Sequence, residues 1–188
     1  ARGVIRRYKP RIVMVTGSVG KTSTKDAVAA ALGSRFFVRK SEKNFNTEFG
    51  VPYAIFGVAK DPMRNPFSWL AVFKKAFALL LLPNHYANLL VLEVGAEQPG
   101  DLKKILRIAM PDAVVVTRLP GIPVHVEFYE SPEAVREEEF GPAFALGPSA
   151  PLILPVDDAD ARAMSKRVPA RLYTYGSAAE DSTRLSDI

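Results

Sequence analysis

Short apolar segments alternate with helical patterns along the 188 residues of the chain. Apolar runs typical of buried strands occupy residues 11–16, 36–39, 88–94, 112–117, 151–154 and 171–175. Apolar residues at helical spacing, or an early proline, indicate helices over 22–32, 51–58, 67–82, 100–109 and 132–140. This alternation predicts an α/β fold, in which a mostly parallel sheet is flanked by helices.

Capping residues place three of the helix boundaries. Gly33 follows the helix predicted over 22–32 and provides a C-terminal stop. Ser131 precedes Pro132, and this pair is typical of an N-cap followed by the first helical residue. Pro142 is expected to end that helix, because proline lacks the backbone N–H that a helix interior needs.

The most apolar stretch of the sequence, 67–82, contains two lysines. Lys74 and Lys75 leave only 76–82 as an unbroken apolar run, far short of the ~20 residues that cross a bilayer. We expect a helix that packs on the sheet with its lysines in water. A surface for a partner or a peripheral membrane contact is the alternative. No signal-peptide pattern is visible at the N-terminus, so the expected location is the cytoplasm.

Composition narrows the class of protein further. A hydrophobic fraction of 48% and a charged fraction of 24% are typical of a folded domain. The absence of cysteine excludes a disulfide scaffold, a thiolate metal centre and a cysteine nucleophile. The net charge of +5 points to anionic partners. Basic residues cluster within 2–11, but without an aromatic-rich motif for nucleic acid the simplest interpretation is a solvated terminus.

A glycine-rich loop, TGSVGKTST at 16–24, directly follows the first predicted strand and opens a helix. Gly17 and Gly20 let backbone N–H groups approach phosphate oxygens, and the helix N-terminus adds partial positive charge. Lys21 can reach terminal phosphates, and the Thr22 hydroxyl can bind Mg²⁺. The sequence therefore predicts a phosphate-binding loop. Its candidate residues are Gly17, Ser18, Val19, Gly20, Lys21, Thr22 and Ser23.

Three motifs together resemble the central ATP-binding domain of the Mur ligases, a P-loop NTPase-like fold. They are GSVGKTSTK at 17–25, NFNTEFGVP at 44–52, and LEVGA at 92–96 followed by PGD. The resemblance covers about 11–176, and it is strongest to the members that add D-Ala-D-Ala to a UDP-muramoyl peptide. Residues 1–10 then form a basic N-terminal segment, and 177–188 form a tail or a linker to a missing domain.

The resemblance implies an enzyme of peptidoglycan precursor synthesis. Mur ligases use ATP to phosphorylate a substrate carboxylate, and an amine then attacks the acyl phosphate to form an amide. The implied cofactors are ATP and Mg²⁺, and the implied substrates are a UDP-muramoyl peptide and D-Ala-D-Ala, with no nucleic acid. Because family enzymes also have a sugar-binding domain and a C-terminal domain, we expect this chain to be incomplete for ligation.

The resemblance also assigns roles to individual residues. Glu93 matches a ligand of a first Mg²⁺, together with Thr22, and His125 matches a ligand of a second. Asn44 and Asn46 match a loop near the phosphates and the incoming substrate. A contact of Asp157 or Asp158 with the adenosine is also expected, although relatives commonly carry Asn where this sequence has Asp157.

One position departs from the family pattern. Where the family usually has a carbamylated lysine as an anionic metal ligand, this sequence aligns Glu139. A run of acidic residues is usually a solvated helix face, yet a glutamate carboxylate could serve in place of the carbamate. The hypothesis is that Glu139 binds or orients the second Mg²⁺; the alternative is a degenerate homologue in which the chemistry of the second metal is weakened.

Two alternatives to this function remain open at the level of sequence. One is a related ligase with another substrate, of the folylpolyglutamate or cyanophycin type, or a nucleotide-binding homologue without catalysis. The other is a basic protein that binds nucleic acid or an anionic membrane.

Overall fold

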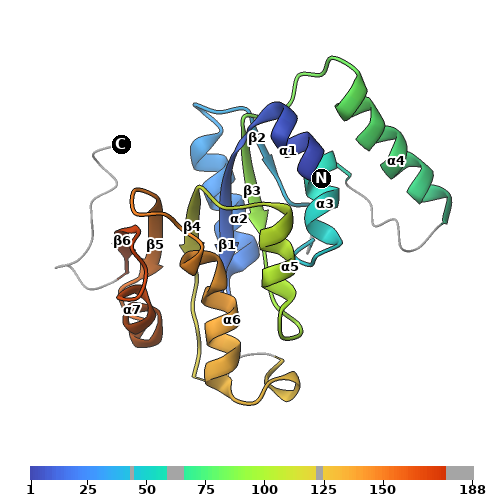
Figure 1. Ribbon diagram of the computed structural model, residues 1–188. Coiled ribbons are helices and arrows are strands. Elements are labelled where there is room, and N and C mark those ends of the chain that lie inside the picture. Colours follow the sequence, from blue (N-terminus) through green and yellow to red (C-terminus); the bar gives the residue numbers. More distant parts are fainter. Residues whose placement is uncertain (43–44, 59–65, 122–124, 177–188) are drawn as a thin grey trace.

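The computed structural model describes residues 1–42, 45–58, 66–121 and 125–176 (Figure 1). Within these residues, all strands join one parallel sheet in the order β2-β3-β1-β4-β5-β6. The strands are β1 (Arg11–Thr16), β2 (Val38–Lys40), β3 (Leu89–Glu93), β4 (Ala113–Val116), β5 (Pro151–Pro155) and β6 (Arg171–Tyr175). The predicted α/β class is therefore confirmed.

Helices connect the strands and cover both faces of the sheet (Figure 1). They are α1 (Arg2–Tyr8), α2 (Lys21–Leu32), α3 (Gly50–Phe56), α4 (Pro66–Leu81), α5 (Asp101–Ile108), α6 (Pro132–Phe144) and α7 (Ala159–Ser165), with a 3-10 turn η2 (Val126–Phe128) before α6. Two separate apolar clusters follow from the alternation of side chains along a strand. Met14 packs with α3, α5 and α6 on one face, whereas Val15 packs with α2 on the other.

Most element boundaries fall within two residues of the sequence-based expectation. The predicted strand at 36–39 is displaced, because the backbone N–H groups of Arg35 and Phe36 both donate to the carbonyl of Leu32. These bonds continue the turn after α2, so β2 begins two residues later than expected, at Val38. The expected cap of α6 is confirmed, since the Ser131 hydroxyl accepts the N–H of Ala134 at 3.2 Å.

The prediction that Pro142 ends its helix is wrong. Helix α6 continues through Pro142 to Phe144. Gly141 precedes the proline and has no Cβ, which removes part of the clash that normally excludes a helical residue there. Phe140 and Ala143 are fully buried in the core, so packing holds the last turn despite the missing hydrogen bond.

The basic N-terminal segment is not a solvated tail. Residues 2–8 form helix α1, and Val4 is completely buried in the main apolar cluster. The Tyr8 ring stacks on Tyr86 at a centroid distance of 4.6 Å, and its hydroxyl donates to the carbonyl of Leu79. A helix of seven residues is too short to show a clear hydrophobic period. The sequence therefore did not predict α1 or its tertiary contacts.

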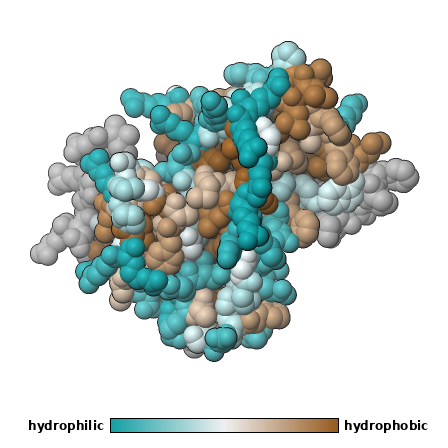
Figure 2. All heavy atoms as spheres, in the orientation of Figure 1, coloured by the Kyte–Doolittle hydropathy of each residue, from teal (hydrophilic) through white to brown (hydrophobic). Residues whose placement is uncertain are grey.

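Helix α4 confirms the helix expected at 67–82, but its main contacts are with α1 and α3 instead of the sheet. Val72 and Leu79 are buried on its inner side, and Lys74 and Lys75 are exposed as expected. Figure 2 shows brown, hydrophobic side chains over this helix at the upper right of the view. No helix in the described residues is long and apolar enough to cross a membrane.

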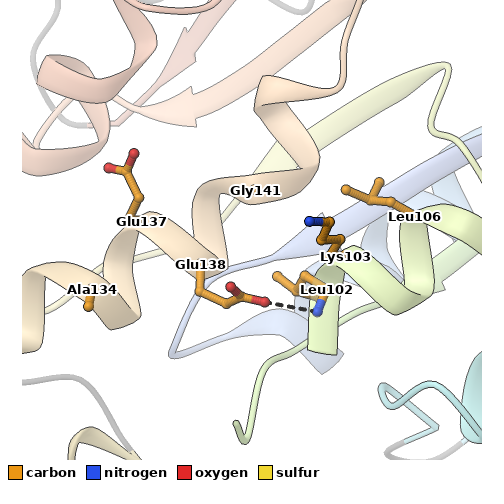
Figure 3. A pocket seen from close by; sticks show the side chains of 7 residues that line it. All are labelled: Leu102, Lys103, Leu106, Ala134, Glu137, Glu138 and Gly141. Carbon is orange, nitrogen blue, oxygen red and sulfur yellow. Dashed lines mark hydrogen bonds between the residues drawn. The ribbon is translucent and has the colours of Figure 1, made fainter. Parts of the chain in front are cut away.

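A shallow cavity of about 280 Å³ lies between α5 and α6 (Figure 3). Leu102 and Leu106 line it from α5, and Glu137 and Glu138 line it from α6. The Glu138 carboxylate accepts the backbone N–H of Leu102 at 3.0 Å and so joins the two helices. None of the residues predicted to carry chemistry lines this cavity.

Candidate active site

The predicted loop lies between β1, in the middle of the sheet, and helix α2. Gly17 and Gly20 have φ angles of 118° and 87°, which side chains other than glycine rarely adopt. A Cβ on Gly17 would also lie 2.4 Å from the Thr117 hydroxyl, at the end of neighbouring strand β4. Helix α2 begins directly after this turn, so its unpaired N–H groups and its positive dipole end face the loop.

Lys21, the first residue of α2, folds over the loop that precedes it. Its ammonium group donates to the backbone carbonyls of Gly17 and Ser18, at 2.5 and 3.2 Å. The charge therefore lies beside the backbone N–H groups that would surround a phosphate. Both glycine geometry and lysine position agree with the sequence-based expectation for a phosphate-binding loop.

A buried carboxylate faces the next residue of the helix. Glu93 is 2% exposed at the carboxyl end of β3, the strand beside β1. The Thr22 hydroxyl lies 3.1 and 3.0 Å from its two carboxylate oxygens. The structure thus brings together the two residues that the sequence assigned to a first Mg²⁺, at the strand ends where open α/β sheets bind ligands.

Lys25 is a site residue that sequence reasoning did not assign. It is 2% exposed, and its ammonium lies 3.5 Å from Glu93 Oε2 and 3.6 Å from Asp26 Oδ1. A buried charge needs a partner of opposite sign. The signal in the sequence was its spacing, because Lys25 follows Lys21 by one helical turn and so faces the same way.

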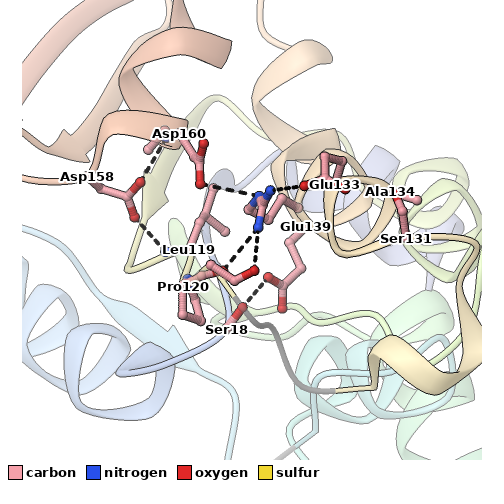
Figure 4. Close-up of polar contacts among 12 residues, drawn as sticks. Ser18, Leu119, Pro120, Ser131, Glu133, Ala134, Glu139, Asp158 and Asp160 are labelled. Carbon is pink, nitrogen blue, oxygen red and sulfur yellow. Dashed lines mark hydrogen bonds and ion pairs between the residues drawn. The ribbon is translucent and has the colours of Figure 1, made fainter.

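Helix α6 places Glu139 against the other side of the loop (Figure 4). The residue is 1% exposed, and its carboxylate accepts a short hydrogen bond from the Ser18 hydroxyl. Burial raises the pKa of Glu139, while the Ser18 hydrogen bond and the charges of Lys21 and His125 oppose that rise. Glu139 is therefore a buried acid aimed at the loop, and it is not part of a solvated helix face.

His125 lies at the beginning of η2 and is exposed to solvent. Its φ of 63° is unusual for a residue with a side chain, and its ring lies 6.5 Å from the Phe128 ring. His125 is one of the groups that act to lower the pKa of Glu139, after the Ser18 hydrogen bond and Lys21. In the described part of the chain, however, no three His, Asp or Glu side chains form a metal-binding cluster.

The loop before α3 lies close to Lys21, because Gly95 between them has no side chain. Gly95 follows β3, and its backbone N–H donates to the carbonyl of Asn46 at 3.0 Å. A Cβ on Gly95 would lie 3.3 Å from the Asn46 amide nitrogen and 3.5 Å from Lys21 Cε. Asn46 therefore lies beside the phosphate loop as expected, whereas Asn44 lies outside the described residues.

The other predicted site residues lie at the edge of the group formed by Lys21, Thr22, Glu93 and Glu139. Val19 and Ser23 are exposed, and Val19 pairs with Arg118 in an isolated bridge. Asp157 follows β5, where a Cβ on Gly176 would lie 2.7 Å from its carboxylate. The structure gives its neighbour Asp158 a structural role, because that carboxylate caps α7 at Ala161.

Arg136 is a second residue that sequence reasoning missed. It is almost buried, and it donates to the carbonyl of Gly121 at 2.8 Å. It also pairs with Glu133 at 2.6 Å and with Asp160 at 3.4 Å. These contacts fix the segment after β4, which leads toward His125, to helices α6 and α7.

The parallel sheet, the glycine loop after its central strand and the acid on the neighbouring strand define an α/β domain of the P-loop type. Comparison with protein families extends this result. The model of the Mur ligase middle domain matches residues 70–188, and the chain belongs to that family.

Individual relatives agree with the family assignment. A UDP-N-acetylmuramoyl-tripeptide–D-alanyl-D-alanine ligase of Bacillus subtilis is 26% identical over 188 residues, which is 100% of this chain and 35% of the relative. The same enzyme of Mycobacterium leprae is 29% identical over 86% of this chain and 26% of its own length. The chain thus spans about a third of the curated relatives it matches.

Solved structures show the same fold. MurF ligase from Thermotoga maritima, in complex with ADP, has a TM-score of 0.69 and 26% identity, covering 93% of this chain and 34% of that one. Folylpolyglutamate synthetase of Helicobacter pylori has a TM-score of 0.52 and 18% identity, covering 93% of this chain and 49% of the other. At that identity the second likeness concerns the fold alone.

Proposed function

We propose that this chain is the ATP-binding domain of an ATP-dependent carboxylate–amine ligase that acts through an acyl phosphate. The observation that carries the proposal is the convergence of Lys21, Thr22 and Glu93 around the loop after β1. The relative from T. maritima in complex with ADP supports a nucleotide as the ligand of this fold.

The loop fits the phosphate tail of ATP. Backbone N–H groups of residues 19–22, at the N-terminus of α2, offer donors to phosphate oxygens, whereas the Ser18 N–H donates to the carbonyl of Arg118. Lys21 would exchange its hydrogen bonds with the Gly17 and Ser18 carbonyls for contacts with terminal phosphates. Charge neutralisation by these groups is the main catalytic requirement of phosphoryl transfer.

Thr22 and Glu93 fit a magnesium ion. Mg²⁺ is usually held by one or two protein oxygens together with phosphate oxygens and water, so a hydroxyl beside one carboxylate is a suitable donor set. When bound, the ion neutralises phosphate charge and orients the transferred group. Lys25 contacts the same carboxylate, and we assign it the role of fixing the orientation of Glu93.

In the proposed reaction, a substrate carboxylate oxygen attacks the γ-phosphorus of ATP, and ADP leaves. The amine nitrogen then attacks the acyl carbon, which yields an amide, a proton and inorganic phosphate. Asn46 lies beside Lys21 across Gly95 and is positioned to contact the incoming substrate. Ser18 and Lys21 would hold the Glu139 carboxylate next to the loop, where with His125 it can bind or orient a second Mg²⁺.

The substrates we propose are a UDP-muramoyl peptide and D-Ala-D-Ala. The support is the printed activity of the relatives from B. subtilis and M. leprae. Since the chain covers about a third of their length, the experiment adds both substrates to the longest product of the reading frame that contains this chain. Release of phosphate that depends on both substrates supports the proposal, and release with a folate and glutamate instead contradicts it.

The nucleotide assignment is tested separately by binding. Titration of the chain with ATP and Mg²⁺ should give saturable heat in calorimetry, and Lys21→Ala should weaken binding at least about tenfold, since a charge-assisted phosphate contact is lost. Lys103→Ala, on the exposed side of α5, is the matched control and should bind like the wild type. Equal binding by Lys21→Ala would refute the proposed phosphate site.

A further inference from the structure

Helix α4 exposes a continuous apolar stripe. Leu70, Phe73, Phe77 and Leu81 follow each other at spacings of three or four residues, which places them on one face of the helix. Leu70 and Leu81 are each 71% exposed and Phe77 is 60% exposed. The opposite side of α4 packs on the protein through Val72 and Leu79. Large apolar side chains gathered in this way mark an interaction surface.

The surroundings of the stripe are basic. Helix α1 lies against the C-terminal part of α4, where Arg7 donates to the carbonyls of Leu80 and Leu82. Arg6 on α1 and Lys74 on α4 are exposed. Neither α1, α3 nor α4, the three helices in mutual contact, contains an acidic residue. Within these three helices, the charged side chains are therefore all positive.

The geometry points to an anionic lipid bilayer as the partner of this face: we propose that α4 lies in the membrane–water interface with its stripe toward the acyl chains. An apolar stripe bordered by Lys and Arg is the pattern of interfacial helices. The sixteen residues of α4 extend ~24 Å, less than a hydrocarbon core of ~30 Å, and Lys74 interrupts them, so the helix would lie on the surface. The proposal is independent of the proposed function.

Vesicle flotation tests the proposal with the complete chain. We expect the chain to float with vesicles of phosphatidylcholine and phosphatidylglycerol, and much less with phosphatidylcholine alone. High salt should weaken binding to the anionic vesicles, because it screens the cationic residues. Equal binding to both kinds of vesicle, or binding to neither, overturns the proposal.

Two sets of variants, each with its control, separate the apolar and the electrostatic contributions. Phe77→Ser should lower the partition coefficient about tenfold, since one aromatic side chain no longer enters the lipid. Leu172→Ser, at an exposed apolar position on β6, is its control and should bind like the wild type. Arg6→Gln and Lys74→Gln should each lower binding about fivefold, whereas Arg162→Gln on α7 should not.

Other occupants of the face give different outcomes. Sedimentation without lipid that shows self-association, abolished by Phe77→Ser, together with no vesicle binding, identifies a second copy of the chain and overturns the proposal. If the longest product of the reading frame that contains this chain fails to float while the chain alone floats, another part of that product covers the stripe, and the proposal is again overturned. Circular dichroism confirms that each variant is folded.

Discussion

At the scale of single residues, the buried pair of Lys25 and Glu93 limits which substitutions the site can accept without loss of stability. Both side chains are nearly inaccessible, and the Thr22 hydroxyl shares the same carboxylate. Desolvation of two charges is costly, so such a pair adds little net stability compared with an apolar pair. Removal of one member is different, because the other then remains buried without a counter-charge.

Lys25→Met should therefore lower the free energy of unfolding by about 3 kcal/mol, measured by urea denaturation in the absence of Mg²⁺. Lys40→Met removes a cation from an ion pair with Asp26 on the surface, and there the loss should be below about 1 kcal/mol. Similar losses for both variants would show that burial of Glu93 without its Lys25 partner does not carry the expected cost.

Glu139 tests the proposed second metal. Glu139→Ala should raise the Mg²⁺ concentration needed for half-maximal ATP turnover, because a buried carboxylate beside the loop is lost. Glu137→Ala changes an exposed carboxylate on the same helix and serves as the control. An unchanged Mg²⁺ dependence in Glu139→Ala would remove Glu139 from the metal site.

At the scale of elements, one tyrosine connects the segments around α1, α3 and β2. Tyr86 donates to the carbonyl of Ile55 at 2.6 Å, stacks on Tyr8, and lies beneath the Arg39 guanidinium at 4.5 Å. Burial raises the pKa of its hydroxyl to about 12 from the usual value of 10. The folded state therefore holds this proton more tightly than the unfolded state.

This difference gives a pH-dependent stability. The contribution is fully present below pH 10 and is lost as the pH rises to about 12, because the unfolded chain loses the proton first. The total amounts to about 2–3 kcal/mol. Tyr86→Phe should lose about 1 kcal/mol at neutral pH with the hydrogen bond, and should show a shallower decline in alkaline urea titrations. A parallel decline would show that other groups cause the alkaline loss.

Elements with strong local patterns were predictable, and those defined by tertiary contacts were not. The strand at 11–16 and the glycine loop follow from residues that are adjacent in sequence. Helix α1 has seven residues, and Val4 is buried in a cluster with Ile55 and Leu79, which lie far along the chain. In the candidate site, the positions of Thr22 and Glu93 were predictable, because one belongs to a motif and the other stands at the end of a strand. The contacts of Arg136 with Glu133 and Asp160 were not, because they form only in the folded chain.

At the scale of the whole molecule, the strand order gathers the chemistry at the centre of the sheet. Strand β1 lies between β3 and β4, so the segments that carry Lys21, Glu93 and His125 leave from three adjacent strands. The edges formed by β2 and β6 carry none of these residues. A ligand bound at this centre would stabilise the complete domain, because it contacts the segments that meet there.

ATP with Mg²⁺, at about 100 times its dissociation constant, should stabilise the folded state by about 2.7 kcal/mol. For a domain of this size the melting temperature should rise by about 5–10 °C in a thermal shift assay. Gly17→Ala should abolish the rise, since its methyl group would collide with Thr117. An identical rise in Gly17→Ala would place the nucleotide elsewhere.

Gly95 separates the group that would face phosphate from the group that would face the second substrate. A methyl group at Gly95 would lie 3.3 Å from the Asn46 amide nitrogen, which would have to move by a few tenths of an ångström, and would make an ordinary contact with Lys21 Cε at 3.5 Å. In the proposed reaction, the alignment of the two reactants would thus depend on the missing side chain of Gly95. Gly95→Ala should therefore weaken the alignment between the nucleotide and the acceptor without preventing either ligand from binding.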